Sequence, residues 1–343
     1  MARVLLNDDE PAADSGGNYF ADQQSPLEFV HSGAAILDCV LGGGWPLSRI
    51  ANVVGDSSSG KTLLAIEAMA NFRRKFPKGQ MFYRESEAAF DEQYAAALGM
   101  PVDHVEFIEP DKFVTVEDFY EDLTKCIERC GKKEVPAFYV VDSLDALTSQ
   151  DERDRDFDEA SFETKKAKQM GKLFRMCSSA VGRVNMCLMI ISQTRDRINV
   201  TFGGPKKTRS GGRALDFYAS QVLWLSHRDK VDESRSGTKR VVGIHVRAQM
   251  QKSKIALPYR ECDFTIRFGQ GVDSVASSLD WLENVKRLED VTDGASRRVY
   301  VNRLSKMSDA DYWVETARVD KEVVRLWREI ESDFLGTARP KYR

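Results

Sequence analysis

The chain has 343 residues, of which 42% are hydrophobic, so it can bury the core of one large domain and of a smaller one. Charged residues make up 30% of the sequence and nearly balance, which leaves a net charge of −3. No run of about 18 apolar residues occurs and the N-terminal segment is too acidic for a secretion signal, so membrane-spanning and secreted classes are excluded and we expect a cytoplasmic protein.

Three regions follow one another along the chain. Residues 1–30 hold six acidic side chains against one arginine and few apolar residues, which predicts a flexible acidic arm. Residues 31–273 carry the strand and helix patterns of a large core. Residues 274–343 are mainly helical, most clearly at 319–336, and predict a small α-rich C-terminal domain.

Within the core region, short apolar runs alternate with helical patterns. The runs predict strands at 49–55, 79–86, 104–110, 137–143 and 185–193. Amphipathic helices are predicted at 61–76 and 115–130, and the second opens with a capping box of Thr115 and Asp118. Apolar strands separated by helices are typical of a parallel sheet, so the predicted fold class is α/β with a mostly parallel central sheet.

The pattern changes after residue 214. Strands are predicted at 220–228, 239–251 and 261–269, with a turn at 232–238. Because strands joined without an intervening helix pair antiparallel, we expect an antiparallel extension of the parallel sheet.

The cysteines and histidines show no metal-binding pattern. The six cysteines include no CxxC pair, and the four histidines are far apart. Cys126 and Cys130 are one helical turn apart without a histidine neighbour, so reduced core thiols are favoured over a zinc site, which stays an alternative.

The segment GDSSSGKT follows the strand at 49–55 and precedes the helix at 61–76. The spacing GxxxxGKT between a strand and a helix predicts a phosphate loop that binds a nucleoside triphosphate. Backbone N–H groups and the helix start would hold phosphates, Lys61 would reach the β- and γ-phosphates, and the Thr62 hydroxyl would ligate Mg²⁺. The predicted nucleotide contacts are Gly55, Asp56, Ser57, Ser58, Ser59, Gly60, Lys61 and Thr62.

Phosphate hydrolysis also needs a carboxylate near the metal and a group that orients the attacking water. Asp142 ends an apolar strand at the sheet edge where ligands of α/β proteins gather, so we predict that it acts with Thr62 at the metal; a plain turn residue is the alternative. Glu85 and Glu87 stand at the end of another strand, and the residues alone leave open which one polarises water.

Residues 195–213 carry six cations and one acid and are interrupted by glycines. A solvated surface loop would have this composition. So would a loop that binds single-stranded DNA, because cations and N–H groups hold phosphates while apolar side chains wedge between bases. The residues predicted to contact DNA are Arg195, Arg197, Ile198, Phe202, Lys206, Lys207, Arg209, Gly211, Gly212 and Arg213.

From residue 31 to residue 273 the chain resembles the RecA family of DNA recombinases, and in places its UvsX-like bacteriophage branch. The segments that carry the resemblance are GDSSSGKT, ESEAAFDEQYAAALG, VVDSLDALTSQ, ISQTRDRINVTFGGP with GGRALDFYAS, and QKSKIALPYR. The resemblance implies a RecA-like ATPase core that uses ATP and Mg²⁺. It implies a DNA-dependent ATPase that forms helical filaments on single-stranded DNA and exchanges strands with a homologous duplex.

The resemblance also implies roles for single residues at the nucleotide. It places the catalytic glutamate at Glu87, the γ-phosphate sensor at Gln193, and the adenine contacts at Asp91 and Tyr94. Ser192 stands where the family usually has asparagine, which puts the detail of the sensing in doubt.

Five lysines receive roles in the same way. Lys252 and Lys254 correspond to a pair that reaches a neighbouring subunit's nucleotide, which fits a position distant from the phosphate loop in the sheet order. Lys165, Lys166 and Lys168 lie near the first DNA loop, where the resemblance is poor, and the solvated face of a helix is the alternative for them.

The implied partners include single-strand-binding and mediator proteins. The implied location is the bacterial cytoplasm, including that of a phage-infected host. A ring-forming helicase and an ATP-binding recombination accessory protein share the phosphate loop and the sheet, and both remain alternative functions.

Overall fold

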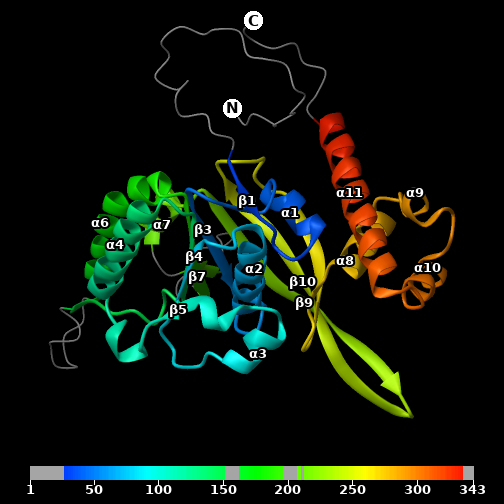
Figure 1. Cartoon of the computed structure of the whole chain (residues 1–343), viewed down its shortest axis with the longest axis horizontal. Coiled ribbons are helices and arrows are strands. Elements are labelled where there is room, and N and C mark those ends of the chain that lie inside the picture. Colours follow the sequence, from blue (N-terminus) through cyan, green and yellow to red (C-terminus); the bar gives the residue numbers. More distant parts are fainter. Residues whose placement is uncertain (1–26, 151–161, 197–206, 210–211, 335–343) are drawn as a thin grey trace, which may run out of the picture.

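A ten-stranded sheet forms the centre of the protein, whose computed structural model describes residues 27–150, 162–196, 207–209 and 212–334 (Figure 1). The strand order is β12-β11-β10-β9-β3-β7-β6-β4-β5, and β8 pairs with β7. The strands are β3 (Arg49–Gly55), β4 (Gln80–Glu85), β5 (Val105–Phe107), β6 (Ala137–Asp142), β7 (Met186–Asp196), β8 (Lys207–Arg209), β9 (Gln221–Arg235), β10 (Thr238–Ser253), β11 (Glu261–Arg267) and β12 (Gly271–Asp273).

The sheet has a parallel part and an antiparallel part. From β9 through β3, β7, β6 and β4 to β5 all neighbours are parallel. Strands β10, β11 and β12 join in sequence without intervening helices and pair antiparallel. This arrangement confirms the predicted α/β class and its antiparallel extension.

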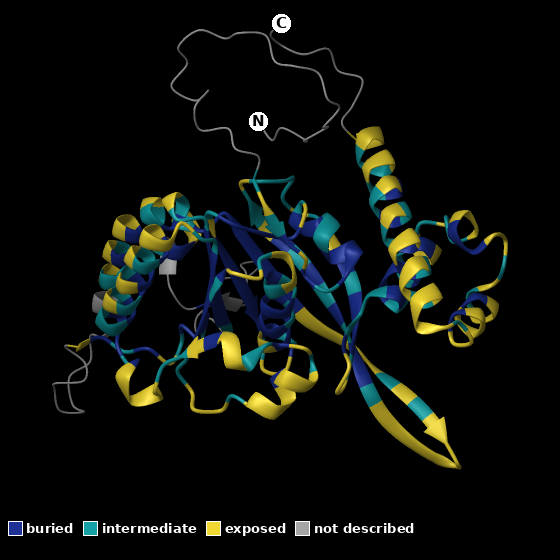
Figure 2. Ribbon diagram, viewed as in Figure 1, coloured by how far each residue is buried: buried dark blue, intermediate teal, exposed yellow. Residues whose placement is uncertain are grey.

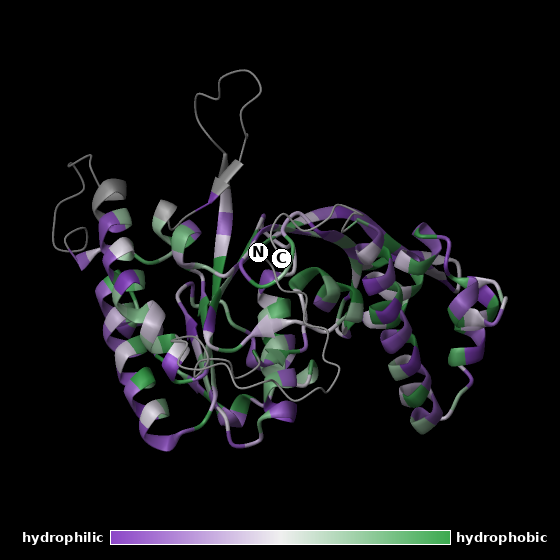
Figure 3. Cartoon of the chain, turned by 90° about the horizontal axis from the view of Figure 1, so that it is seen from above, coloured by the Kyte–Doolittle hydropathy of each residue, from purple (hydrophilic) through white to green (hydrophobic). Residues whose placement is uncertain are grey.

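Helices cover both faces of the sheet. One face is covered by α4 (Val116–Lys133), α6 (Phe162–Arg183) and α7 (Gly212–Tyr218), and the other by α1 (Ala35–Leu41) and α2 (Lys61–Lys75). Because side chains alternate along a strand, Val54 of β3 packs in the first core and Val53 in the second. Figure 2 shows the sheet as the most buried layer, and Figure 3 shows hydrophilic residues along the outer sides of the helices.

Shorter elements connect this framework. They are α3 (Glu92–Ala97) and the 3-10 turns Val102–His104 and Pro110–Lys112. Helix α4 begins with the predicted capping box: Thr115 Oγ1 accepts from the Asp118 N–H at 3.0 Å, and Asp118 Oδ2 accepts from the Thr115 N–H at 2.8 Å. The six cysteines are all free thiols, five of them buried.

The predicted turn at 232–238 is wrong over most of its length. Strand β9 continues to Arg235 and β10 starts at Thr238, so only Ser236 and Gly237 make the turn. Both have positive φ, of 50° and 74°, as a two-residue hairpin turn requires. The result is a long β9–β10 hairpin that projects from the sheet, with a largely exposed end (Figures 1 and 2).

The predicted acidic arm is wrong at its C-terminal end. Residues 1–26 lie outside the described part, but Phe29–Val30 forms strand β1, which pairs with β2 (Trp45–Pro46). Val30 is fully buried, so the chain already belongs to the core at this point.

The C-terminal region consists of α8 (Ser274–Asn284), α9 (Glu289–Thr292), α10 (Arg297–Leu304) and α11 (Asp309–Phe334). Its start at α8 coincides with the predicted boundary at 274, while its buried residues, including Leu279 and Val323, belong to the same hydrophobic core as the α2 side of the sheet. Helix α11 begins ten residues before the predicted pattern at 319. Within the described residues, no helix is both long enough and apolar enough to cross a bilayer.

Candidate nucleotide site and nucleic-acid interface

The phosphate-loop segment runs from Gly55, the last residue of β3, to Lys61 and Thr62, the first two residues of α2. Gly60 immediately precedes α2 with a φ of +91°, a conformation that favours glycine. A Cβ on Gly55 would lie 2.4 Å from Ser59 Oγ and 3.0 Å from the Leu225 carbonyl oxygen. Gly55 is therefore closely packed against the loop itself and against β9, where a side chain would not fit. Gly60 has a backbone conformation that other residues rarely adopt.

Lys61 is the first residue of α2, at the end of the loop. Its side chain is buried, and Nζ donates to the Asp56 carbonyl oxygen at 2.6 Å. Burial lowers the pKa of Lys61, and nearby carboxylates, of which Asp142 has the largest effect, oppose that shift. A buried ammonium group held at the loop can interact strongly with an anion, because little water competes for it.

Thr62, Asp142 and Tyr83 meet beside the loop. Thr62 Oγ1 and the Tyr83 hydroxyl each donate to Asp142 Oδ2 at 2.7 Å. Burial raises the pKa of Asp142, and these two hydrogen bonds oppose the rise. The hydroxyl and the carboxylate are oxygen donors of the kind Mg²⁺ prefers, so the residues present fit the predicted metal site.

The two glutamates after β4 have different surroundings. Glu85 Oε1 accepts from the N–H groups of Glu87 and Ala89 at 2.9 and 3.2 Å, so Glu85 holds its own turn together. Glu87 Oε1 accepts from Ser143 Oγ at 2.6 Å and from Gln193 Nε2 at 3.1 Å. Glu87 therefore faces the strand ends around the loop, which favours it over Glu85 as the group that polarises water.

Strand β7 connects this site to the basic segment. Gln193, near its end, donates its side-chain amide to Glu87 and its N–H to Asp145 Oδ2, the latter at 2.7 Å. The next residue, Thr194, donates from Oγ1 to Asp56 Oδ1 in the phosphate loop. One strand thus carries contacts to both the predicted water-polarising glutamate and the loop.

The predicted adenine contacts lie at the start of α3. Asp91 precedes the helix, and its Oδ1 accepts from the Tyr94 N–H at 2.9 Å as an N-cap. Tyr94 is 36% exposed, so its ring is accessible to a ligand. Burial raises the pKa of Tyr94, and this partial burial leaves one part of the side chain packed and another at the surface.

Only the ends of the basic segment are described. Arg195 is the second-last residue of β7. Lys207 and Arg209 lie in β8, and Gly212 and Arg213 are the first two residues of α7. Strand β8 pairs antiparallel with β7, with Arg195 opposite Thr208, so residues 195–196 and 207–209 of the predicted loop are paired strands. The predicted contacts outside the described residues are Arg197, Ile198, Phe202, Lys206 and Gly211.

Arg209 differs from the predicted role. Its side chain is only 5% exposed, and Nη2 forms an ion pair with Asp216 Oδ1 of α7. Burial lowers the pKa of Arg209, and Asp216 opposes this. A phosphate contact on DNA would require a guanidinium exposed to solvent, and that of Arg209 is buried. It links β8 to α7 instead.

Lys252 and Lys254 lie at the C-terminal end of α7. Lys252 Nζ donates to the carbonyl oxygens of Asp216 and Phe217, the second at 3.1 Å, and Lys254 Nζ donates to the Phe217 oxygen at 2.9 Å. Cations are favourable at a helix C-terminus because its last carbonyl groups lack helical partners. Burial and the neighbouring Lys254 lower the pKa of Lys252.

The sheet-order argument for these two lysines is wrong. Strand β10 is only two places from β3 in the sheet. The separation is along the strands instead. Lys252 of β10 lies opposite Val222 of β9, and Val222 lies opposite Asn52 of β3. The phosphate loop begins three residues after Asn52, about 10 Å further along β3. Lys252 is thus level with the middle of β3, and Lys254 follows it in the direction away from the loop of their own chain.

The three lysines of the predicted first DNA loop fall on the first turns of α6. Lys168 is exposed, as a solvated helix face would have it. Lys166 Nζ donates to the Asp145 carbonyl oxygen at 3.2 Å, and the side chain of Lys165 lies outside the described part. The structure therefore places Lys166 near the nucleotide site and Lys168 in solvent.

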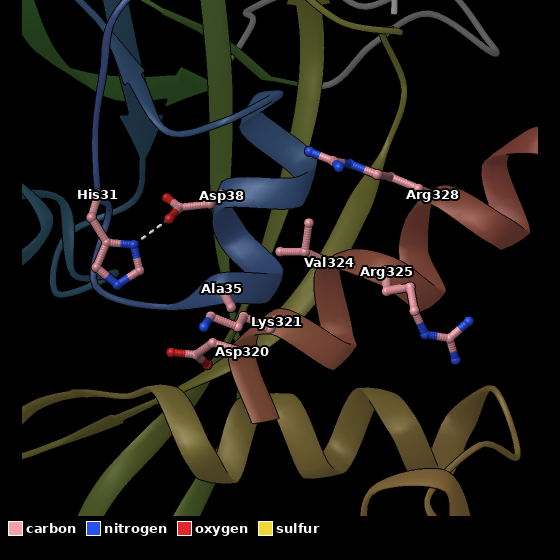
Figure 4. Close-up of a pocket in the computed structure, with 8 residues that line it drawn as sticks. All are labelled: His31, Ala35, Asp38, Asp320, Lys321, Val324, Arg325 and Arg328. Atoms are coloured by element: carbon pink, nitrogen blue, oxygen red, sulfur yellow. Dashed lines mark hydrogen bonds and ion pairs between the residues drawn. The ribbon is translucent and has the colours of Figure 1, made fainter. Parts of the chain in front are cut away.

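A pocket of about 520 Å³ lies elsewhere, between α1 and α11 (Figure 4). Its lining includes the paired side chains His31 and Asp38 from the α1 side, and Asp320 and Arg328 from α11. None of the predicted nucleotide or DNA contacts lines it, so it is separate from the site described above.

Sequence reasoning missed Tyr83, Ser143 and Asp145. Tyr83 precedes Glu85 by two residues, and the period of two along a strand puts both on one face of β4. Ser143 and Asp145 follow Asp142 in the same strand exit, where polar residues at the carboxyl edge of a parallel sheet gather. These positions could have been found by extending the search from each predicted carboxylate to its strand neighbours.

Comparison with known proteins agrees with this geometry. A family model described as the RecA N-terminal domain matches residues 18–273. Protein RecA of Borrelia hermsii is 35% identical over 255 residues, covering 74% of this chain and 68% of that protein. Protein RecA of Synechocystis sp. is 32% identical over 260 residues, covering 76% and 70%. Protein RecA of Nostoc punctiforme is 30% identical over 305 residues, covering 88% and 80%.

Proposed function

This chain belongs to the RecA family and is an ATP-dependent recombinase, and we propose that ATP turnover at the loop after β3 controls how tightly residues 195–213 bind DNA. It is a DNA-dependent ATPase coupled to strand exchange, and it binds DNA and forms filaments as its family does. The observation that carries the proposal is the hydrogen bond from Gln193 Nε2 to Glu87 Oε1, because Gln193 lies on the strand that leads into the basic segment.

At the nucleotide, each residue has a separate task. Lys61 and the loop N–H groups bind the phosphates, and Thr62 and Asp142 would hold Mg²⁺, which supplies charge stabilisation on the phosphate oxygens. Glu87 orients the attacking water and takes up its proton. Asp91 and Tyr94 contact the base. Because Glu87 also holds Gln193, a change at the γ-phosphate can move the end of β7.

The DNA-binding part of the proposal concerns both strands of the reaction. The filament holds single-stranded DNA and admits a homologous duplex, since phosphate contacts position a strand without reading its bases. Single-strand-binding and mediator proteins are its proposed accessory partners, and the cytoplasm of a bacterium, including a phage-infected one, its proposed location. A strand-exchange assay with matched and mismatched duplexes tests the function. DNA-stimulated ATP turnover without exchange of the matched duplex would favour an accessory protein.

Removing a phosphate contact from residues 195–213 should change the salt dependence of binding. We expect Arg197→Ala to weaken binding to single-stranded DNA about equally for all sequences and to reduce the salt slope by about 0.7, because fewer counterions are released. Arg209→Ala is the matched control: its side chain is buried and paired with Asp216, so stability should fall while the slope stays as in wild type. Binding titrations over a range of salt concentrations measure both. An unchanged slope for Arg197→Ala and for the equivalent Lys206 variant would contradict the DNA assignment.

Lys252 should act on the nucleotide of a neighbouring subunit. Lys252→Ala protein keeps its own phosphate loop, and Lys61→Ala protein keeps its Lys252, so a mixed filament contains interfaces with one intact loop and one intact Lys252. We expect mixing two nearly inactive proteins to restore part of the ATP hydrolysis. The measurement is the hydrolysis rate against mixing ratio, with electron microscopy to confirm filaments. Filaments without any rescue would show that Lys252 does not act in trans.

A further inference from the structure

Tyr83 lies in the middle of β4 with a fully buried side chain. Its hydroxyl donates to Asp142 Oδ2 at 2.7 Å, the oxygen that also accepts from Thr62 Oγ1 at 2.7 Å. Within the described part of the chain, no hydrogen bond reaches the other oxygen, Oδ1. These two hydrogen bonds therefore hold the carboxylate through Oδ2.

The strand pairing explains why Tyr83 can reach Asp142. In the parallel register of β4 and β6, Glu85 lies opposite Asp142 and Tyr83 lies opposite Val140. Tyr83 and Asp142 are thus diagonal neighbours on one face of the sheet, a separation that a long aromatic side chain can span.

The ring of Tyr83 is fixed by its neighbours. Its centroid lies 4.6 Å from that of Phe90 and 5.9 Å from that of Phe107, which both lie on the α2 side of the sheet. A buried ring packed in this way has few rotamers available, so its hydroxyl is preorganised. A phenylalanine would fill the same space and make the same ring contacts, so the hydroxyl is not required for packing.

We propose that Tyr83 is a positioning residue for the divalent cation of the ATPase: its hydroxyl fixes the Asp142 carboxylate beside Thr62 so that Oδ1 faces the cation or its water. This inference rests on the proposed metal role of Thr62 and Asp142. The physical reason is general, since groups that hydrogen-bond a metal ligand orient it and raise the affinity of the site.

The chain supplies a matched control in Tyr139. Tyr139 is also fully buried in the sheet, on the neighbouring strand β6, and its hydroxyl donates to Asp122 Oδ2 at 2.6 Å. Asp122 lies on α4, on the opposite face of the sheet from α2, and takes no part in the phosphate-loop contacts. Tyr139→Phe therefore removes the same atom from the same kind of hydrogen bond, away from the cation.

The test is a titration of Mg²⁺ against the binding of a fluorescent ATP analogue, with purified full-length wild-type, Tyr83→Phe, Tyr139→Phe and Asp142→Asn proteins. We expect Tyr83→Phe to raise the Mg²⁺ concentration for half-maximal binding about 10-fold, while Tyr139→Phe stays at the wild-type value. Thermal unfolding without nucleotide shows whether the two tyrosine variants lose similar stability.

The four proteins separate the possible results. If Asp142→Asn raises the Mg²⁺ concentration for half-maximal binding but Tyr83→Phe does not, the inference about Tyr83 is wrong and the metal site stands. Equal shifts in both tyrosine variants would also overturn it, because the effect would then be one of general stability. If Asp142→Asn leaves the Mg²⁺ dependence unchanged, the proposed metal role of that carboxylate fails, and the role of Tyr83 fails with it.

Discussion

Lys61→Ala is expected to abolish ATP turnover while the protein stays folded. Lys61 Nζ is a buried cation whose one hydrogen-bond acceptor among the described residues is the Asp56 carbonyl oxygen, so its removal deletes the positive charge at the phosphates without opening the hydrophobic core. Loss of one preorganised charge-stabilising donor typically costs about 100- to 1,000-fold in rate, and we expect at least that. Nucleotide affinity should fall too, because charge-assisted hydrogen bonds to phosphate are lost.

The measurements are ATP hydrolysis, nucleotide affinity and thermal unfolding. Lys75→Ala is the control: Lys75 ends the same helix, and its Nζ also donates to a backbone carbonyl, that of Phe29, at 2.9 Å. It should retain wild-type turnover. Wild-type nucleotide affinity in Lys61→Ala would mean that GDSSSGKT is not the phosphate loop.

Glu87→Gln is expected to leave ATP and DNA binding intact and to reduce hydrolysis by about 100- to 10,000-fold, the usual contribution of a general base. The amide oxygen of glutamine can still accept from Ser143 Oγ and Gln193 Nε2, so the contacts of Glu87 survive while its charge is lost. Binding isotherms and single-turnover hydrolysis separate these effects.

Glu85→Gln is the matched control for this second prediction. Its amide oxygen can accept the N–H groups of Glu87 and Ala89 as the carboxylate does, so we expect near-normal hydrolysis. If Glu85→Gln alone stops hydrolysis, the water-polarising residue is Glu85, and the assignment along RESE is wrong by two positions.

The elements around the phosphate loop were predictable because local rules determine them. An apolar run, a glycine-bounded loop and an amphipathic pattern predict β3, the loop and α2, and the spacing of Thr115 and Asp118 predicts the start of α4. Such signals lie within a few residues of one another, so no knowledge of the tertiary structure is needed.

The contacts between elements were not predictable in the same way. That Tyr83 reaches Asp142 depends on the register of β4 against β6, which a single sequence does not specify. The burial of Arg209 depends on how α7 packs beside β8, so composition alone predicted an exposed cation. The extent of the β9–β10 hairpin was missed because its polar residues are typical of a turn, although a ribbon exposed on both faces has the same composition.

Because of the β9–β10 hairpin, the free energy of local unfolding differs between parts of the molecule. Strand β9 has β3 as a second neighbour only over Gln221–Leu225, and β10 has β11 only over Gly243–Gln249. Between Asp232 and Val241 the described residues of the two strands pair only with each other, and a lone two-stranded ribbon in water is marginally stable. Its outer part can therefore fray and re-form in a local equilibrium with a small free energy of opening, while the amides of β3, β6 and β7 exchange only when the whole core unfolds.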